Sequence, residues 1–425
     1  MTEGTRTTPL YAWHTARGAN MAEFGGYDMP LWYSSAKGEH LAVLTAAGLF
    51  DTSHMAVVTI TGPDARDLLQ RCFTQDLDRC IGPSKRAQFP GRCVYGAFLG
   101  PDGGVIDDAI VYLFDEGQYM VVVNAGMGGP IADHLRDHAG GRSVTVTDLT
   151  DRLGKIDLQG PAAARIIAPL LSLADPVFES LPYFAFKGGC EALGIKSPTD
   201  DVRLADGTPI LLSRTGYTGE FGFEIFADPD RIVGIWERII DAGEDVGLMP
   251  CGLAARDSLR AGAVLPLSHQ DIGHWPFIDH PWPFALPFSE DGTGFTKDFI
   301  GADALLAARG QSFTRPFVGN DLRKVAVTPE TAVDDDDGGT IGGVLTCVSD
   351  MGIGRVDGRI FSIASPDRPA GFTPRGLCCG FVKVDRPLAA GREVTLRDQR
   401  RKIRVVIADD IRPDRTARRP LRDMR

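Results

Sequence analysis

The strongest constraint on the fold is a change in the character of the chain at about residue 280. Before this point, strand-like apolar runs alternate with stretches whose apolar residues recur at helical spacing, such as DARDLLQRCF and RIVGIWERIIDAG. After it, the apolar runs are short, rich in β-branched residues and separated by turn residues, as in GLCCGFVKV and RKIRVVIAD. The sequence therefore predicts a mixed α/β body without an internal repeat, followed by a small β-barrel or sandwich.

The length of the chain indicates more than one domain, because 425 residues exceed what a single core usually serves. We expect an α/β body over residues 1–285 and a connecting segment over 286–319. A C-terminal β-barrel should follow over 320–412. The last stretch, 413–425, is basic and interrupted by proline, and we expect it to be a frayed tail.

The charge balance and the absence of long apolar runs restrict the partners. The net charge is −11 and the pI is about 5.3, which argues against nucleic acid or an anionic membrane as the main partner. No apolar run approaches the roughly 20 residues that span a bilayer. The start, MTEGTRTTPLYAWHTARGAN, lacks the apolar core of a signal peptide. We therefore expect a cytoplasmic protein.

Cysteine and histidine spacing does not predict a metal site. The eight cysteines are scattered apart from Cys378-Cys379, with no C-x-x-C pair, and are expected to be buried thiols. The eight histidines include no H-E-x-x-H, and the close group that we recognise is His269, His274 and His280 in a loop rich in proline and tryptophan. There is also no phosphate-binding glycine motif. We expect no metal.

The stretch SRTGYTGEFGFEIF, residues 213–226, places three glycines and two glutamates between strand-forming residues. Gly216, Gly219 and Gly222 predict a tight turn, because glycine adopts backbone angles that other residues resist. A carboxylate at such a turn, Glu220, could be held rigidly in front of a flat polar ligand. The alternative is an ordinary hairpin with a solvated glutamate.

A second candidate is the pair Asp107-Asp108 in GGVIDDAIVYLF, which follows the hairpin turn GPDGG. Neighbouring residues of a strand point to opposite faces, so one of the two carboxylates should point inward. Apolar surroundings would raise its pKa and let it act as an acid or base near neutral pH. The alternative is that both carboxylates are solvated at the end of the strand.

Two further clusters carry polar groups that could serve a ligand. In CGLAARDSLRAG, Arg256 and Arg260 are four residues apart and would share a helix face, with Asp257 beside them. They could bind a carboxylate-bearing ligand, or they could be surface arginines paired to acids. In FDTSHM, Met55 could line an apolar pocket, and His54 could be a core histidine with satisfied hydrogen bonds.

Taken in order along the chain, these motifs resemble one family. The segments TPLYAWHTARGANMAEFGGYDMPLWY, GLFDTSHM, GGVIDDAIVY, VVVNA, LQGP, RTGYTGEFGFEI and GLAARDSLR look like those of the aminomethyltransferase family. This family comprises the T-protein of the glycine cleavage system and its folate-dependent relatives. The resemblance is collinear from about residue 8 to residue 272 and later includes DFIGADALL.

The resemblance implies an α+β fold of three domains in a cloverleaf-like arrangement, with two interwoven α/β subdomains, a C-terminal β-barrel and tetrahydrofolate in a central channel. By the family pattern, Asp108 is the catalytic residue, and Glu220 would face the amide and amino edge of the pterin. The residues implied to bind the folate are Glu220, Tyr95, Met55, Asn124, Tyr112, Tyr217 and Arg256.

The implied activity is the transfer of an aminomethyl carbon from a lipoyl carrier protein to tetrahydrofolate, with release of ammonia. Two departures from the family pattern concern the donor side. Gly262 replaces the customary glutamate of L-R-L-E-A-G, and PLSHQDIGHWPFIDHPWPF replaces a plainer loop. These departures keep two alternatives open. One is a folate-dependent demethylase acting on a sulfonium, betaine or aryl ether, and the other is a non-catalytic folate-binding protein.

Overall fold

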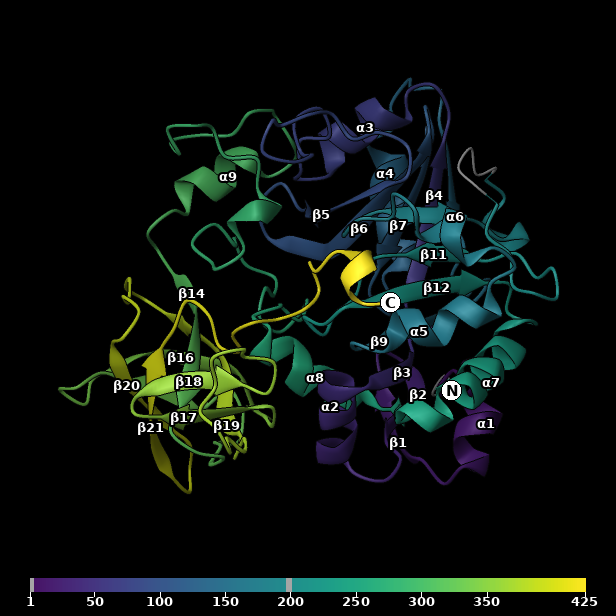
Figure 1. Cartoon of the computed structure of the whole chain (residues 1–425). Coiled ribbons are helices and arrows are strands. Elements are labelled where there is room, and N and C mark those ends of the chain that lie inside the picture. The colour runs from purple at the N-terminus through teal and green to yellow at the C-terminus, as the bar shows by residue number, and fades with distance from the viewer. Residues whose placement is uncertain (1–3, 196–200) are drawn as a thin grey trace.

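The computed structural model describes residues 4–195 and 201–425, and these residues form two open sheets and one closed barrel (Figure 1). The five-stranded sheet carries α3 and α4, the six-stranded sheet carries α5 and α7, and the barrel lies to one side of both. The fold therefore mixes helices and sheets and ends in a closed barrel of six strands, as the sequence predicts.

The five-stranded sheet has the order β5-β6-β7-β4-β8, and all its pairings are antiparallel. Alternating apolar residues of its strands pack against the apolar faces of α3 and α4 and form one buried core. The elements are β4 (Ala56–Thr61), α3 (Ala65–Cys72), β5 (Arg92–Leu99), β6 (Val105–Asp115), β7 (Gln118–Val123), α4 (Gly128–Asp137) and β8 (Thr145–Asp148).

The six-stranded sheet has the order β10-β11-β12-β9-β3-β13, in which only the β13–β3 pair is parallel. A second core fills the space between this sheet and the helices α5 and α7. This core includes the buried ring of Trp236. The elements are β3 (Ala47–Asp51), β9 (Gly154–Gln159), α5 (Ala163–Ile167), α6 (Ala174–Phe178), β10 (Phe186–Gly188), β11 (Leu211–Ser213), β12 (Gly222–Ala227), α7 (Ile232–Gly243) and β13 (Leu248–Cys251).

The chain passes twice between the two sheets. It leaves the six-stranded sheet after β3, builds all of the five-stranded sheet, and returns with β9 beside β3. Further elements flank the sheets: α1 (Tyr11–Ala16), β1 (Asn20–Phe24), β2 (Tyr27–Trp32), α2 (Ala36–Thr45), α8 (Leu253–Gly262), α9 (Ala302–Ala307) and 3-10 turns at Ala168–Leu170, Glu191–Leu193, Glu244–Val246, Pro283–Ala285 and Leu421–Asp423.

The barrel has the order β14-β19-β16-β15-β20-β21 and encloses its own apolar core. It begins earlier than the sequence predicts, because β14 lies inside the segment 286–319 assigned to a connection. Pro316 in β14 interrupts the strand pattern in the sequence. The strands are β14 (Phe313–Gly319), β15 (Ala332–Asp334), β16 (Thr340–Asp350), β19 (Leu377–Val384), β20 (Glu393–Arg397) and β21 (Lys402–Ile407), with a side hairpin of β17 (Ile353–Val356) and β18 (Arg359–Ser362).

The basic tail is packed, and the expectation that it is frayed is wrong. Leu421 and Met424 are buried in the core of the six-stranded sheet, and the guanidinium of Arg214 donates to the carbonyls of Ala417 and Arg419. Figure 1 accordingly shows the C-terminus beside β12 and α5. The sequence predicts a frayed tail because arginine and proline dominate this stretch, whereas its two large apolar residues, Leu421 and Met424, pack into the core.

Arg412, just before this tail, connects the barrel to the six-stranded sheet and to α8. The residue is 1% exposed, and its guanidinium pairs with Asp350 at the end of β16 and with Glu220 in the turn before β12. It also donates to the carbonyls of Thr218 and of Leu259 in α8. Burial alone would raise the pKa of Asp350, but Arg412 and the hydrogen-bonded His40 hold it below its usual range.

Replacing Arg412 with Met should therefore be strongly destabilising. The change keeps most of the side-chain volume but leaves two buried carboxylates without their cation, a loss that costs about 3–5 kcal/mol. Urea unfolding followed by circular dichroism measures it. The matched control is Arg323→Met, which removes an arginine whose side chain is 72% exposed and should leave stability nearly unchanged. Equal stability of the two variants would contradict a linking role for Arg412.

Candidate functional site

Asp107 and Asp108 of β6 lie on opposite faces of the strand, as the alternation predicts. Asp107 is fully buried, whereas Asp108 is half-buried on the same face as Ile110 and Tyr112. The alternative of two solvated carboxylates at the end of the strand is wrong. The pair sits where β6 faces β5, with Asp108 opposite Ala97 and Asp107 opposite Phe98.

Three hydrogen bonds from two side chains fix the position of these carboxylates. The hydroxyl of Tyr95 donates to Asp108 Oδ2 at 2.7 Å. The amide of Asn124 donates to Asp108 Oδ1 at 2.7 Å and to Asp107 Oδ1 at 2.8 Å. Burial and the neighbouring charge of Asp107 raise the pKa of Asp108 to about 6. A carboxylate with such a pKa is ionised at neutral pH and can still exchange a proton there.

A segment from the loop after α8 reaches the buried partner of this pair. Ser268 donates to Asp107 Oδ1 at 2.8 Å, and His269 Nε2 lies 3.1 Å from the same oxygen. His269 has a φ of +58°, a backbone conformation that favours glycine and is strained for an imidazole-bearing residue. The strain places a half-exposed imidazole next to the two carboxylates. The hydrogen bond to Asp107 raises the pKa of His269.

The turn between β11 and β12 uses its glycines in two ways. Gly219 has a φ of +77°, which permits the reversal of the chain. Gly216 lies against the amide of Gln159, and a Cβ at this position would come within 2.2 Å of its Oε1. The turn is therefore fixed by close packing as well as by backbone angle. Two acids follow it, Glu220 just before β12 and Glu224 within β12.

Glu220 does not lie with the Asp108 group. Its carboxylate pairs with Arg412, with 3.2 Å between Arg412 Nε and Glu220 Oε1, and accepts the Thr416 hydroxyl at 2.6 Å. The side chain is 3% exposed, and burial raises its pKa. These contacts run to the C-terminal tail, so the structure gives Glu220 a joining role between β12 and the tail. This placement differs from the predicted position in front of a pterin.

Glu224, which the sequence analysis did not select, lies with the predicted residue Tyr112. Glu224 Oε2 accepts the Thr215 hydroxyl and the Tyr112 hydroxyl, the latter at 3.3 Å. Glu224 Oε1 accepts Lys155 Nζ at 2.6 Å, and Lys155 also donates to Asp157 Oδ1 at 2.7 Å. The sequence signal for Lys155 and Asp157 is the segment GKIDLQ of β9, where charged residues alternate with apolar ones in a strand that is buried along its length.

Arg256 completes a set of buried charges. Its guanidinium donates to Asp157 Oδ2 at 2.7 Å and lies 4.8 Å above the ring of Tyr217. Lys155 and Arg256 together balance Asp157 and Glu224, as buried charges require. Arg260 on the same helix does not join this set, because it pairs with Asp257 and Asp271.

His54 and Met55 border the set of buried charges. Burial lowers the pKa of His54 to about 4, and its Nδ1 has no hydrogen-bond partner among the described residues. His54 is thus a core histidine, as one interpretation expects, with one ring nitrogen that has no protein partner among the described residues. Met55 packs against the apolar cluster that includes Tyr112 and Phe226.

One face of β6 joins the two groups. Asp108, Ile110 and Tyr112 alternate along it, so Asp108 and Tyr112 are separated by four residues, or about 13 Å. Tyr95 lies opposite Ile110 on β5 and covers the interval between them. The structure thus places a proton-exchanging carboxylate, Asp108, at one end of this strand face and the acid Glu224, which accepts from Tyr112, beside the other end.

The histidines of the proline- and tryptophan-rich loop do not form a metal site in the part of the chain that the structure describes. His269 and His274 contact each other edge to face, whereas His280 stacks between Phe277 and Trp282. A closer pair is His134 in the last turn of α4 and His138 directly after α4, four residues apart in the sequence.

Two sheets and a barrel of this arrangement define the cloverleaf-like class that the sequence predicts. The solved structure "Crystal structure of glycine cleavage system aminomethyltransferase T from Bartonella henselae" is similar with a TM-score of 0.72 and 26% identity. The match covers 95% of this chain and 97% of that one. The predicted fold is therefore confirmed.

The sequence comparisons identify the family. The family model "GCVT N-terminal domain" matches residues 10–275. The chain is 40% identical to the "Aminomethyltransferase" of Streptomyces coelicolor, over 73% of this chain and 76% of that protein. It is 34% identical to the "Aminomethyltransferase" of Bacillus subtilis, over 82% and 89%. The chain belongs to the aminomethyltransferase family, and the leading functional prediction is confirmed. Nothing in these relatives favours the demethylase alternative.

The helices were also compared with the requirements of a membrane span. Of those in residues 4–195 and 201–425, none combines the length and the apolarity needed to reach across a bilayer.

The cause of the raised pKa of Asp108 can be tested with Asp107→Asn. This change removes the like charge but keeps the shape, so the pKa of Asp108 should fall from about 6 toward its ordinary value. Carbonyl-carbon NMR of labelled aspartate follows the titration directly. The matched control is Asp102→Asn, in the exposed turn of the same hairpin, which should leave the pKa of Asp108 unchanged. A pKa that stays at about 6 in Asp107→Asn would show that burial alone raises it.

Proposed function

We propose that this aminomethyltransferase uses tetrahydrofolate as its acceptor and takes the aminomethyl carbon from a lipoyl carrier protein. The family uses tetrahydrofolate as a co-substrate. The nitrogens of this folate that accept the carbon lie in the pterin ring and directly beside it, so one face of β6 can serve both the reacting amine, through Asp108, and the polar edge of the ring, through Glu224 next to Tyr112. The observation that carries the proposal is the position of Asp108 between Tyr95 and Asn124. The cytoplasmic location stays a prediction.

The role of Asp108 follows from its protonation. The folate supplies the nucleophilic nitrogen that accepts the carbon. Asp108, ionised above about pH 6, holds that amine in place and accepts its proton. Tyr95 and Asn124 each donate to one oxygen of the carboxylate, which fixes its orientation and leaves further lone pairs for the amine. The buried carboxylate of Asp107 lies beside Asp108, and its negative charge raises the proton affinity of Asp108.

The residues at the other end of the site fit a pterin. A carboxylate accepts about four hydrogen bonds, and Glu224 accepts three, from Lys155, Thr215 and Tyr112. Its Oε1 therefore retains capacity for one donor of the ring. Tyr112, Tyr217 and Met55 supply aromatic and thioether surface close by, and Arg256 is held at the edge by Asp157. We assign the recognition of the pterin to Glu224, in place of Glu220.

The donor side differs from the family pattern in two places. His269, with its strained backbone, contacts Asp107, and Phe284, which is 53% exposed, lies 5.7 Å from Tyr95 between ring centroids. These two residues place an imidazole and an aromatic ring next to the reacting end. They leave the folate end untouched, so the proposal of tetrahydrofolate does not depend on the identity of the donor.

Mass analysis of the folate product tests the activity. The protein is incubated with tetrahydrofolate and an aminomethyl-lipoyl carrier protein, and in parallel with tetrahydrofolate and a panel of methylated sulfonium, betaine and aryl ether compounds. We expect methylene-tetrahydrofolate and ammonia from the carrier. In the same assay Asp108→Ala should lower turnover at least about tenfold while folate binding persists.

The control for this variant is Asp102→Ala, which removes an exposed carboxylate from the turn of the same hairpin and should leave turnover unchanged. Methyl-tetrahydrofolate from a small donor, with no product from the carrier, would contradict the proposal and favour a demethylase. Undiminished turnover of Asp108→Ala would remove the assignment of Asp108.

Glu224→Gln and Glu220→Gln distinguish the two acids of the turn. A hydrogen bond to a charged group contributes about 1.5–3 kcal/mol, so Glu224→Gln should raise the Kd for tetrahydrofolate about 10- to 150-fold. Glu220→Gln should leave this Kd within about twofold, since its carboxylate serves Arg412, and should lower the melting temperature instead. Calorimetric titration and thermal unfolding measure the two effects. The opposite assignment of the effects would return the pterin to Glu220.

A further inference from the structure

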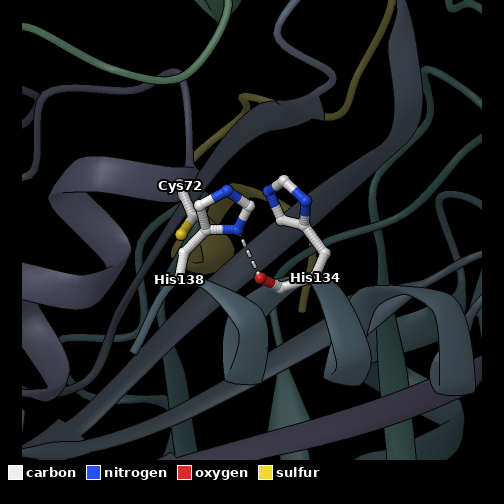
Figure 2. A group of neighbouring side chains, drawn as sticks. All are labelled: Cys72, His134 and His138. Atoms are coloured by element: carbon white, nitrogen blue, oxygen red, sulfur yellow. Dashed lines mark hydrogen bonds between the residues drawn. The ribbon is translucent and has the colours of Figure 1, made fainter. Parts of the chain in front are cut away.

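Three potential metal ligands meet on the helical side of the five-stranded sheet. Cys72 is the last residue of α3, His134 lies in the last turn of α4, and His138 is the residue directly after α4. Figure 2 shows the two imidazoles side by side with the thiol next to them. Their donor atoms all lie within 4.8 Å of one another. Among the described residues, this is the one group of three or more His, Cys, Asp or Glu side chains with such a geometry.

The hydrogen bonds of the two histidines leave a nitrogen on each ring for a ligand bond. His138 Nδ1 donates to the carbonyl of His134 at 2.8 Å, which fixes the tautomer in which Nε2 carries the free lone pair. A backbone carbonyl on the distal nitrogen is the usual partner of a zinc-binding histidine. His134 Nε2 is buried and has no hydrogen-bond partner among the described residues. An unpartnered buried nitrogen is costly unless a ligand satisfies it.

We propose that Cys72, His134 and His138 bind one Zn²⁺ ion, with water as the fourth ligand. One thiolate and two imidazoles are a donor set that Zn²⁺ accepts, and histidines at i and i+4 share one helix face. Tetrahedral bonds of about 2.0–2.3 Å would place the donor atoms about 3.3–3.7 Å apart. The observed distances between the donor atoms, up to 4.8 Å, would shorten to these values after small rotations of the three side chains.

The charges around the group permit a cation. Three cations lie near Cys72. Arg71 is paired with Asp298 and Arg142 with Asp67, and the ammonium of Lys297 donates to the carbonyls of Gln70 and Phe73. Both histidines are half-buried, so water can reach the fourth coordination position of the ion. The ion would join the end of α3 to α4 and so stabilise the helical layer over the sheet. This inference does not depend on the proposed transfer reaction.

Titration of the metal-free protein with Co²⁺, as a spectroscopic substitute for Zn²⁺, tests the proposal. The protein is prepared without an affinity tag and treated with a chelator. We expect one Co²⁺ per chain, with the visible bands of a tetrahedral site and a near-ultraviolet thiolate-to-cobalt band, both lost on addition of Zn²⁺. Cys72→Ser should abolish the thiolate band. His134→Gln with His138→Gln should weaken Zn²⁺ binding at least about 100-fold, beyond the loss expected for an outer partner.

The matched control is Cys80→Ser, which removes the half-buried thiol that follows α3 and should leave the spectrum and the affinity unchanged. A second measurement avoids dependence on the folding of the variants: Zn²⁺ should raise the melting temperature of the unaltered protein. No stoichiometric site in the unaltered protein, or a thiolate band that survives Cys72→Ser, would overturn the proposal. Binding that is equal in all variants would show adventitious metal only.

Discussion

The buried guanidinium of Arg412 is the contact on which the placement of the barrel against the six-stranded sheet and α8 depends. It neutralises Asp350 from the barrel and Glu220 from the turn before β12, and both acids are buried. The space that Asp350 occupies exists because residue 262 is glycine: a Cβ there would lie 1.8 Å from Asp350 Oδ2. The glutamate that the family pattern places at this position of α8 is thus replaced by a carboxylate from the barrel.

Rigid placement of the parts matters because the site is assembled from several of them. Asp108 and Tyr112 come from the five-stranded sheet, Glu224 and Lys155 from the six-stranded sheet, and Arg256 from α8. A proton-transfer group works only at hydrogen-bond distance from its target. The β6 face sets the spacing between the two ends of the site, and the contacts of Arg412 keep α8 and the turn against it.

The sequence predicts the elements well and the partners of the buried charges poorly. Asp108 could be found because its motif is local: a turn, a strand and the alternation of β6 are enough. Glu220 and Glu224 are four residues apart in the same turn and strand, and no local pattern tells which one faces the site. That choice is made by Arg412 and Thr416, almost 200 residues later in the chain. The tail and β14 were misjudged for a similar reason, because proline and arginine conceal contacts that only the folded chain reveals.

The charges around Glu224 bear on specificity. A carboxylate that faced a neutral ring alone in a buried site would be costly, and its pKa would rise until it was protonated. Lys155 offsets this penalty by pairing with Glu224 and Asp157, and Arg256 pairs with Asp157. Under the proposed function, the ring that binds at Glu224 offers hydrogen-bond donors and carries no charge of its own, since an extra cation or anion would unbalance the set. A pterin edge meets that requirement, and we therefore propose that a charged small donor is recognised at the end near Asp108 and His269 instead.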